Sequence, residues 1–343
     1  MNEGDEHWMA MALAEAARGD GLTSPNPPVG AVIVHGGRVL GTGWHRKAGS
    51  PHAEIEALAI VQPQDQALLR DASLFITLEP CSTHGRTPPC VDAILAAGFT
   101  RVVWAVDDPY PGHAGRAQAM LCEAGIKVTT GVLREQALRL IAPFVRRITT
   151  GLPWVTMKAG TSLDGSITLP PGEGQWLTSE ASRADAMRLR SQCDAIMAGA
   201  ETIRVDDPAL TTRGPAISPE KEQPWRVILT NSGNLPPEAQ VFTDAWAART
   251  LVRQNQPMET VLRELAEMGC CRVLIEGGGR IHAAALSAGL VNEIILYMAP
   301  LLSPDGVPVV APGILAARSV PLSIEKVERI GQDIRIQALV RDP

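Results

Sequence analysis

Short apolar segments alternate with longer segments of helical periodicity along the first 150 residues, and this alternation restricts the fold more than any other feature. Gly36-Gly37 separates two of the apolar runs and is typical of a β-hairpin turn. We expect helices over 5–18, 52–61, 90–97, 114–124 and 135–148, and strands over 29–34, 38–43, 73–78, 101–106 and 126–130. Such an order predicts a layered α/β domain.

The remainder of the chain shows a second alternation of the same kind. A short polar segment with Gly and Pro, 149–153, precedes it, so we expect domains at 1–148 and 149–343. We expect strands over 154–159, 195–199, 226–230, 272–276 and 293–298, helices over 179–192, 259–268 and 280–288, and Pro/Gly-rich loops over 212–224 and 231–237. The second domain is therefore also predicted to be α/β.

Composition limits the classes of function. The 343 residues suggest about two domains, and the net charge of −6 disfavours binding to nucleic acid. No apolar run is long enough to span a membrane, and no basic leader segment is visible, so we expect a cytoplasmic protein. Six cysteines are too few for a disulfide scaffold and are expected to fill the core or to bind metal.

Three candidate metal ligands each follow a proline: His52, Cys81 and Cys90. Proline is favoured in the first turn of a helix, so we expect His52 and Cys90 to lie at helix N-termini. Cys81 is a further candidate for such a position. The positive end of a helix dipole lowers a thiol pKa and favours the thiolate that binds metal. Two thiolates and one imidazole suit Zn²⁺ and leave the fourth position for water.

Glu54 is the candidate acid/base residue beside this zinc site. Zinc lowers the pKa of a bound water toward ~7, and a carboxylate outside the metal shell can then move protons. Zinc nucleobase deaminases carry a related H-x-E and P-C-x-x-C pattern, although here eight residues separate the two cysteines. Two alternatives are a buried cysteine pair without metal and a structural zinc with His84 as fourth ligand. We expect Cys122, Cys193, Cys270 and Cys271 to be packing residues.

Longer motifs make the chain recognisable over nearly its whole length. They are SPNPPVG (24–30), GWH (43–45), AGSPHAE (48–54), TLEPCSTHGRTPPC (77–90), KAGTSLDG (158–165), GAETIRVDDPALTTR (199–213) and EGG (276–278). The chain resembles the bifunctional deaminase–reductases of riboflavin biosynthesis. That resemblance implies an N-terminal, cytidine-deaminase-like, three-layer α/β/α domain and a C-terminal α/β domain like dihydrofolate reductase.

The resemblance also implies the chemistry. The first domain would remove an amino group from a diaminopyrimidine ribosyl phosphate with zinc, and the second would reduce the ribosyl chain to ribityl with NADPH. The expected partners are this small phosphorylated pyrimidine and other copies of the chain in a homo-oligomer, with no nucleic acid and no membrane. By resemblance, the deaminase substrate would contact Asn26, His45, Arg86 and Asp108. NADPH would contact Gly160, Trp176, Thr202, Asp206, Gly278 and Gly279, and the reductase substrate would contact Gly174, Arg190, Leu210, Arg213 and Glu276.

Elementary chemistry supports part of this assignment. Arg190 and Arg213 carry the planar donors that bind phosphate well, although an arginine on a helix is often only solvated. Gly277 to Gly279 follow a predicted strand and precede a predicted helix, where backbone N–H groups can approach a phosphate. A glycine cluster at such a place is otherwise only a turn, and it does not match G-x-G-x-x-G.

Several positions depart from the family pattern. The family commonly has His at Thr83, Asn at Tyr110, Ser at Gly174, Asp at Thr230 and Asn at Ile141. One alternative is therefore a paralogue with the same deaminase chemistry on a related pyrimidine and an altered or degraded reductase domain. A nucleic-acid-binding protein on the deaminase fold is a third hypothesis, which the acidic charge and the 4% aromatic content disfavour.

Overall fold

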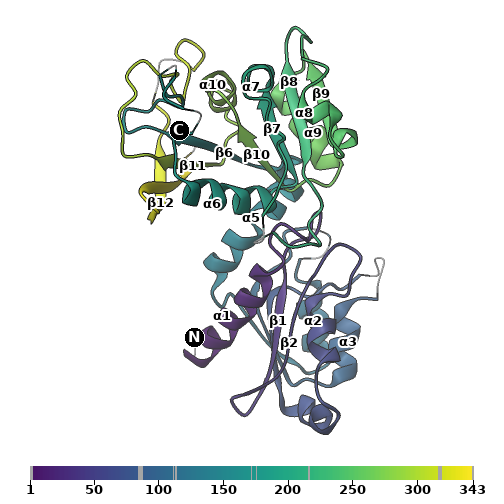
Figure 1. The fold of residues 1–343 in the computed structure, drawn as a ribbon. Helices are drawn as coiled ribbons and strands as arrows, with labels where there is room; N and C mark the ends of the chain where they lie inside the picture. Colours follow the sequence, from purple (N-terminus) through teal and green to yellow (C-terminus); the bar gives the residue numbers. More distant parts are fainter. Residues whose placement is uncertain are drawn as a thin grey trace. The chain divides into compact units, whose positions relative to one another are not determined.

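The computed structural model divides the chain into two compact units, Met1–Gly151 and Leu152–Pro343, which we call the first and the second unit. It describes residues 3–83, 88–110, 112, 114–170, 172–174, 176–214, 217–315 and 319–341. Both units are α/β, as expected (Figure 1). Among the described residues, no helix combines the length and the apolar character that a membrane span requires.

The first unit is built on a five-stranded sheet of order β2-β1-β3-β4-β5. Strand β1 pairs antiparallel with β2 and β3, while β3, β4 and β5 are parallel. The strands are β1 (Gly30–His35), β2 (Arg38–Trp44), β3 (Ser73–Leu78), β4 (Arg101–Val106) and β5 (Lys127–Thr130). The helices are α1 (Glu3–Ala17), α2 (Ala53–Ala59), the 3₁₀ helix η1 (Pro63–Asp71), α3 (Cys90–Ala97), α4 (Arg116–Glu123) and α5 (Arg134–Thr150).

Alternate residues of the central strands supply two separate cores. Ile33, Ile76 and Trp104 are buried on one face with residues of α2, α3 and α4. Val32, Phe75 and Val103 are buried on the other face with residues of α1 and α5. Because successive side chains of a strand point to opposite faces, helices cover both sides of this sheet. The result is the expected three-layer α/β/α arrangement.

Two local features of the first unit differ from the sequence-based expectation. Helix α5 continues through Thr150, into the segment expected to be a hinge, and ends at Gly151, whose φ of 68° is left-handed. The 3₁₀ helix η1 was not expected, because its polar sequence lacks a helical apolar stripe.

The second unit is built on an eight-stranded sheet of order β12-β13-β11-β6-β10-β7-β8-β9. Strands β11, β6, β10, β7, β8 and β9 are parallel, and β13 runs antiparallel between β11 and β12. The strands are β6 (Trp154–Thr161), β7 (Ala195–Gly199), β8 (Trp225–Thr230), β9 (Thr250–Gln254), β10 (Arg272–Glu276), β11 (Glu293–Met298), β12 (Leu322–Ile330) and β13 (Asp333–Val340). The helices are α6 (Glu180–Ser191), α7 (Ala200–Asp206), α8 (Gln240–Thr243), the 3₁₀ helix η2 (Ala247–Arg249), α9 (Met258–Glu267) and α10 (Gly279–Ser287).

This second sheet is also covered on both faces. Met157 and Ile275 are buried with residues of α9 and α10, whereas Ile196 and Leu274 are buried with residues of α6, α7 and α8. Because β10 and β7 are parallel neighbours, their carboxyl ends meet at one edge of the sheet, where open α/β sheets usually bind their ligands.

Candidate functional site

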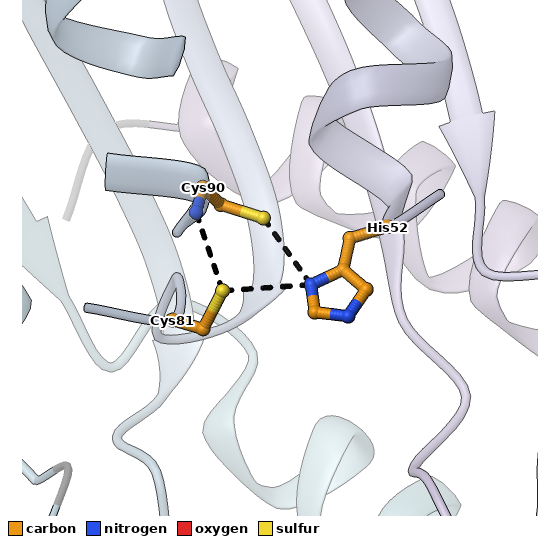
Figure 2. Close-up of side chains that lie close together, drawn as sticks. All are labelled: His52, Cys81 and Cys90. Carbon is orange, nitrogen blue, oxygen red and sulfur yellow. Dashed lines mark hydrogen bonds between the residues drawn. The ribbon is translucent and has the colours of Figure 1, made fainter. Parts of the chain in front are cut away.

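Three donor side chains converge in the first unit (Figure 2). His52 is the N-cap of α2, and Cys90 is the first residue of α3. The Nδ1 atom of His52 lies 3.2 Å from Sγ of Cys90 and 3.5 Å from Sγ of Cys81. All three donor atoms lie within 4.8 Å of one another. Helices α2 and α3 bring His52 and Cys90 together because both helices pack on the same face of the sheet.

This donor set fits a zinc ion. Zinc binds thiolate and imidazole at about 2.0–2.3 Å, which separates tetrahedral ligands by about 3.5 Å, close to the two distances above. The thiol of Cys90 and the imidazole of His52 lower the pKa of Cys81 to about 4. The hydrogen bond between the Cys90 thiol and Cys81, together with burial, raises the pKa of Cys90. Cys81 therefore ionises more readily than Cys90, and metal binding would release the proton of the second thiol.

The expectation that Cys81 lies at a helix N-terminus is wrong. Cys81 lies in the loop that follows β3, because the strand ends at Leu78 and no helix begins before Cys90. It nevertheless faces the positive end of a helix. The backbone N–H of Cys90, the first residue of α3, donates to Sγ of Cys81 over 3.2 Å.

Glu54 lies beside the three donors, on the second residue of α2. In a regular helix it would point about 200° away from His52. His52 precedes the helix with extended backbone, φ −74° and ψ 165°, so the regular helical spacing does not apply. Its charge acts on the Glu54 carboxyl, so the two side chains lie near each other. Burial raises the pKa of the Glu54 carboxyl, which is only 3% exposed and is hydrogen-bonded by Cys90.

Two further predicted residues adjoin this cluster. The ring of His45 lies edge-on to the ring of His52, with centroids 5.2 Å apart. Its Nδ1 is 3.1 Å from the carbonyl of Pro51, which can only accept, so Nδ1 donates and Nε2 accepts from the Asn26 amide over 3.1 Å. Burial lowers the pKa of His45, and the imidazole is neutral.

The loop that carries Asp108 is held by a residue of the TLEPC motif. The carboxylate of Glu79 accepts the backbone N–H groups of Asp108, Gly115 and Ala117. Of the family departures, Thr83 is half-buried and Tyr110 is exposed. Arg86 and His84 lie outside the described residues, and Ile141 is a core residue of α5 that packs with residues of the sheet.

In the second unit, a glycine turn links β10 to α10. Gly278 is the N-cap of α10, and a Cβ built on it would meet no atom within 4 Å, so the turn is open on this side. A Cβ on Gly277 would come within 3.3 Å of Oγ1 of Thr202, so this turn packs against α7. A glycine turn that is open at the N-cap of a helix leaves room for the phosphate of a nucleotide cofactor.

A buried charge cluster lies beside that turn. Nε and Nη2 of Arg190 donate to the two carboxylate oxygens of Glu276 over 2.9 and 2.6 Å, and Nη1 donates to the carbonyl of Thr211. Nζ of Lys158 lies 4.0 Å from the same carboxylate. Burial opposes ionisation of Glu276, but Arg190, Lys158 and Arg213 outweigh it and lower its pKa to about 2.

The other predicted residues of the second unit lie on loops and element ends. Gly160 is near the end of β6, where a Cβ would come within 3.0 Å of the Thr178 methyl group. Trp176 is 59% exposed beneath the guanidinium of Arg183. Asp206 is the last residue of α7, and Thr230 is the last residue of β8. Leu210 is buried and has a left-handed φ of 48°, and Gly174 has a φ of 117°. Arg213 is exposed.

Sequence reasoning missed three residues that organise these clusters. Lys158 and Glu79 belong to motifs quoted for the resemblance, and those motifs could have indicated them. No sequence pattern indicated Arg226. It is fully buried, pairs with both oxygens of Asp244, and donates to the carbonyl of Ala209 in the loop that carries Leu210.

Comparison with known proteins covers both units. The family described as the cytidine and deoxycytidylate deaminase zinc-binding region matches residues 2–106. The family described as the RibD C-terminal domain matches residues 153–336, more than half of the chain.

Relatives match along nearly the entire chain. The riboflavin biosynthesis protein RibD of Bacillus amyloliquefaciens is 39% identical, and the alignment covers 98% of this chain and 97% of that protein. The structure of Acinetobacter baumannii RibD, form 1, has a TM-score of 0.88 at 35% identity, covering 98% of this chain and 99% of that one. The diaminohydroxyphosphoribosylaminopyrimidine deaminase/5-amino-6-(5-phosphoribosylamino)uracil reductase of Thermotoga maritima has a TM-score of 0.89 at 31% identity, with the same coverage.

Proposed function

This chain belongs to the RibD family of riboflavin-biosynthesis enzymes, and from that premise we propose which of its residues carry out the two reactions. It is a bifunctional enzyme with a zinc-dependent deaminase activity and an NADPH-dependent reductase activity. Full-length similarity to RibD proteins favours this function over that of a paralogue with a degraded second domain.

We propose that residues 1–148 carry the deaminase and that His52, Cys81 and Cys90 hold its zinc. The observation that carries this proposal is the meeting of the three donor atoms beside the buried Glu54. Zinc, when bound, supplies a water acidic enough to act as a nucleophile near neutral pH. Glu54 moves protons to the ring nitrogen and to the leaving amine, because its raised pKa allows it to hold a proton and release it.

The neutral polar groups around the zinc site would orient the pyrimidine. His45 is held by Pro51 and Asn26, so its ring cannot turn without breaking two hydrogen bonds. Asp108 would contact the substrate from the neighbouring loop. Arg86, which lies outside the described residues, would contact it as well. A small phosphorylated pyrimidine is the substrate class that these residues support.

We propose that residues 149–343 carry the reductase. NADPH, when bound, supplies the hydride that reduces C1′ of the substrate. Gly278 and Gly279 at the start of α10, together with Thr202, Asp206, Gly160 and Trp176, would bind this cofactor. The ribosylamine of the substrate opens to an imine, and reduction at C1′ gives the ribityl amine.

The charge cluster of the second unit supports binding of an anionic substrate. One carboxylate, Glu276, is surrounded by Arg190, Lys158 and Arg213, so the cluster has an excess of positive charge that attracts phosphate. Nε, Nη1 and Nη2 of Arg190 already donate hydrogen bonds to Glu276 and Thr211, whereas Arg213 is exposed. We therefore assign the phosphate chiefly to Arg213, and Arg190 to holding Glu276 and the loop of Leu210 beside the substrate. Gly174 would line the same site.

One incubation tests both activities. The full chain is mixed with the diaminopyrimidine ribosyl phosphate, with and without NADPH, and ammonia and NADPH are followed separately. We expect ammonia in both samples and oxidation of NADPH after deamination. Ammonia without any NADPH oxidation would contradict the reductase assignment. Cys81→Ala and Cys90→Ala should each lose stoichiometric zinc, and retention of the metal by these variants would contradict the ligand assignment.

We also propose that the protein is a homo-oligomer of the cytoplasm. Val327 and Ile324 on the edge strand β12 pair with Ile336 and Ala338 of β13, which lie two residues apart and therefore share a face. Val327 is 59% exposed and Ile324 65%, so this face offers an apolar surface to a second copy. No disulfide links the six cysteines, all of which lie in the described part of the chain, in keeping with a reducing compartment.

A further inference from the structure

We infer that Glu79 is a positioning residue of the deaminase site, which holds the loop of Asp108 in place for the substrate. The inference rests on the proposed function, since it takes the assignment of Asp108 to substrate binding from there. It concerns a residue that is itself neither a metal ligand nor a substrate contact in that assignment.

Glu79 stands where three parts of the site meet. It directly follows β3, and its backbone N–H donates to the carbonyl of Val106, the last residue of β4, over 2.8 Å. Two residues later the same loop carries the zinc-ligand candidate Cys81. The side chain is only 4% exposed and turns toward the connection between β4 and α4.

The carboxylate of Glu79 binds both ends of that connection. Its Oε2 accepts the N–H of Asp108 over 3.1 Å, at the start of the loop, and that of Gly115 over 3.0 Å, at the N-cap of α4. Its Oε1 accepts the N–H of Ala117 over 3.1 Å, in the first turn of the helix. One side chain therefore ties the loop closed and satisfies two amides at the start of α4.

Only a carboxylate of this length fits the three donors. Glutamine presents an NH₂ group in place of one oxygen, and that group would face at least one backbone N–H without an acceptor between them. Aspartate is one methylene shorter and cannot reach both Asp108 and Ala117 from the same backbone position. A buried amide that loses its acceptor is costly, so the loop would rearrange to find another.

The consequence for catalysis is specific. The backbone N–H of Asp108 is one of the three that Glu79 binds, and the carboxylate of Asp108 also accepts the N–H of Tyr110 over 2.9 Å. Release of the clamp would displace Asp108, while His52 and Glu54 stay at the start of α2 and Cys90 at the start of α3. Cys81 is held to α3 separately, because its carbonyl accepts the N–H of Val91 and its Sγ accepts the N–H of Cys90. Substrate binding should therefore suffer more than zinc binding or the chemical step.

The test compares Glu79→Gln and Glu79→Asp with a matched control, Glu123→Gln, which changes an exposed carboxylate at the far end of α4. Steady-state deamination by the full chain gives KM and kcat, metal analysis gives zinc content, and hydrogen exchange reports on the amides of Asp108, Gly115 and Ala117. We expect KM to rise about tenfold in both Glu79 variants, which corresponds to the loss of about one charge-assisted hydrogen bond. The change in kcat should be smaller. The three amides should exchange at least about tenfold faster, and zinc should stay stoichiometric.

Several results would overturn the inference. Unchanged exchange at the three amides would show that Glu79 does not hold the loop. A lower kcat with unchanged KM would show that it acts on chemistry instead. Reductase activity on deaminated substrate and slow exchange in β3 report whether a variant is folded, and loss of both would assign Glu79 to folding alone. If the wild-type chain releases no ammonia, the proposed function fails, whereas the exchange measurement still tests the clamp.

Discussion

Three buried glutamates of this protein are stabilised in different ways. Glu79 accepts backbone amides, and Glu276 is surrounded by cations. Burial raises the pKa of Glu54, and the neighbouring His52 only partly offsets it. A carboxyl that is buried without a dedicated cation binds a proton more readily, which suits a residue that must carry protons. The surroundings of each side chain thus distinguish a proton carrier from two carboxyl groups that hold neighbouring groups in place.

Glu54→Gln should lower deamination by at least about 10²-fold, because a carboxamide cannot carry protons. Zinc content should be unchanged, since the three donor atoms belong to other side chains. Reduction of deaminated substrate should also be unchanged. Ammonia release, metal analysis and NADPH oxidation measure the three quantities. Glu56→Gln, on the same helix but paired with Arg46, is the control, and near-normal ammonia release by Glu54→Gln would refute the assignment.

The ion pair of Glu276 and Arg190 should make stability depend on pH in the acid range. Glu276 has a folded-state pKa of about 2, below its ordinary 4.5, so the pair stabilises the protein above about pH 4.5 and this contribution is lost as the pH falls toward 2. At about 1.4 kcal/mol per pKa unit, the contribution is on the order of 3 kcal/mol.

Thermal unfolding of the full chain measures this effect. Glu276→Gln should unfold at a lower temperature than wild type at pH 7, and the difference should narrow as the pH falls from 5 to 2.5. The control Glu259→Gln removes an exposed ion pair with Arg263 and should lower the free energy of unfolding by about 0–1 kcal/mol. Its difference from wild type should change little with pH. A constant difference across the pH range for Glu276→Gln would contradict the prediction.

Among the secondary-structure elements, the close packing of α2 on β2 sets the position of His52 and Glu54. A Cβ on Gly43 would come within 2.4 Å of the carbonyl oxygen of Ala53 and of the backbone nitrogen of Ala57. A Cβ on Gly41 would come within 2.3 Å of the Ala57 carbonyl oxygen. Glycine in this strand lets the helix backbone approach, and the helix in turn carries the metal ligand to the two cysteines.

Gly43→Ala should therefore push α2 away from the sheet. Overpacking of this kind costs about 1–3 kcal/mol, and the displacement of His52 should reduce both zinc content and deamination. Reductase activity should persist, because the second unit has its own sheet and cores. Gly4→Ala is the control, since a Cβ there meets no atom within 4 Å. Full zinc content and normal melting of Gly43→Ala would show that the helix tolerates the methyl group.

For the whole molecule, the second sheet ends in two very different edge strands. Strand β12 carries the exposed apolar residues Ile324 and Val327 on a long hairpin, whereas β9 at the opposite edge has five residues, of which Val252 is 38% exposed. A long apolar edge is a site of association unless a partner covers it.

Val327→Glu should therefore convert the proposed homo-oligomer to smaller species, because it places a charge within the apolar face proposed to bind a second copy. Light scattering after size-exclusion chromatography measures the mass. Val252→Glu, on the opposite edge of the same sheet, is the control and should leave the mass unchanged. An unchanged mass for Val327→Glu, or dissociation only by Val252→Glu, would place the interface elsewhere.

The sequence alone was sufficient for the features that depend on local pattern. Strands β3, β4, β7, β10 and β11 and helix α3 have the predicted bounds, because each is a short apolar run bounded by turn or cap residues. The candidate ligands could be chosen because each follows a proline and their types suit zinc. The motifs were long enough to identify the family.

Only the tertiary structure decided what depends on distant parts of the chain. Cys81 reaches a helix N-terminus through α3 and not through a helix of its own. Arg190 and Glu276, 86 residues apart, form a buried pair that no local pattern indicates. Strands β12 and β13 were missed because exposure on both sides of β12 removes the alternation that marks a half-buried strand. Local sequence determines backbone preference and side-chain type, whereas the choice of partner requires packing between segments that are far apart in the sequence.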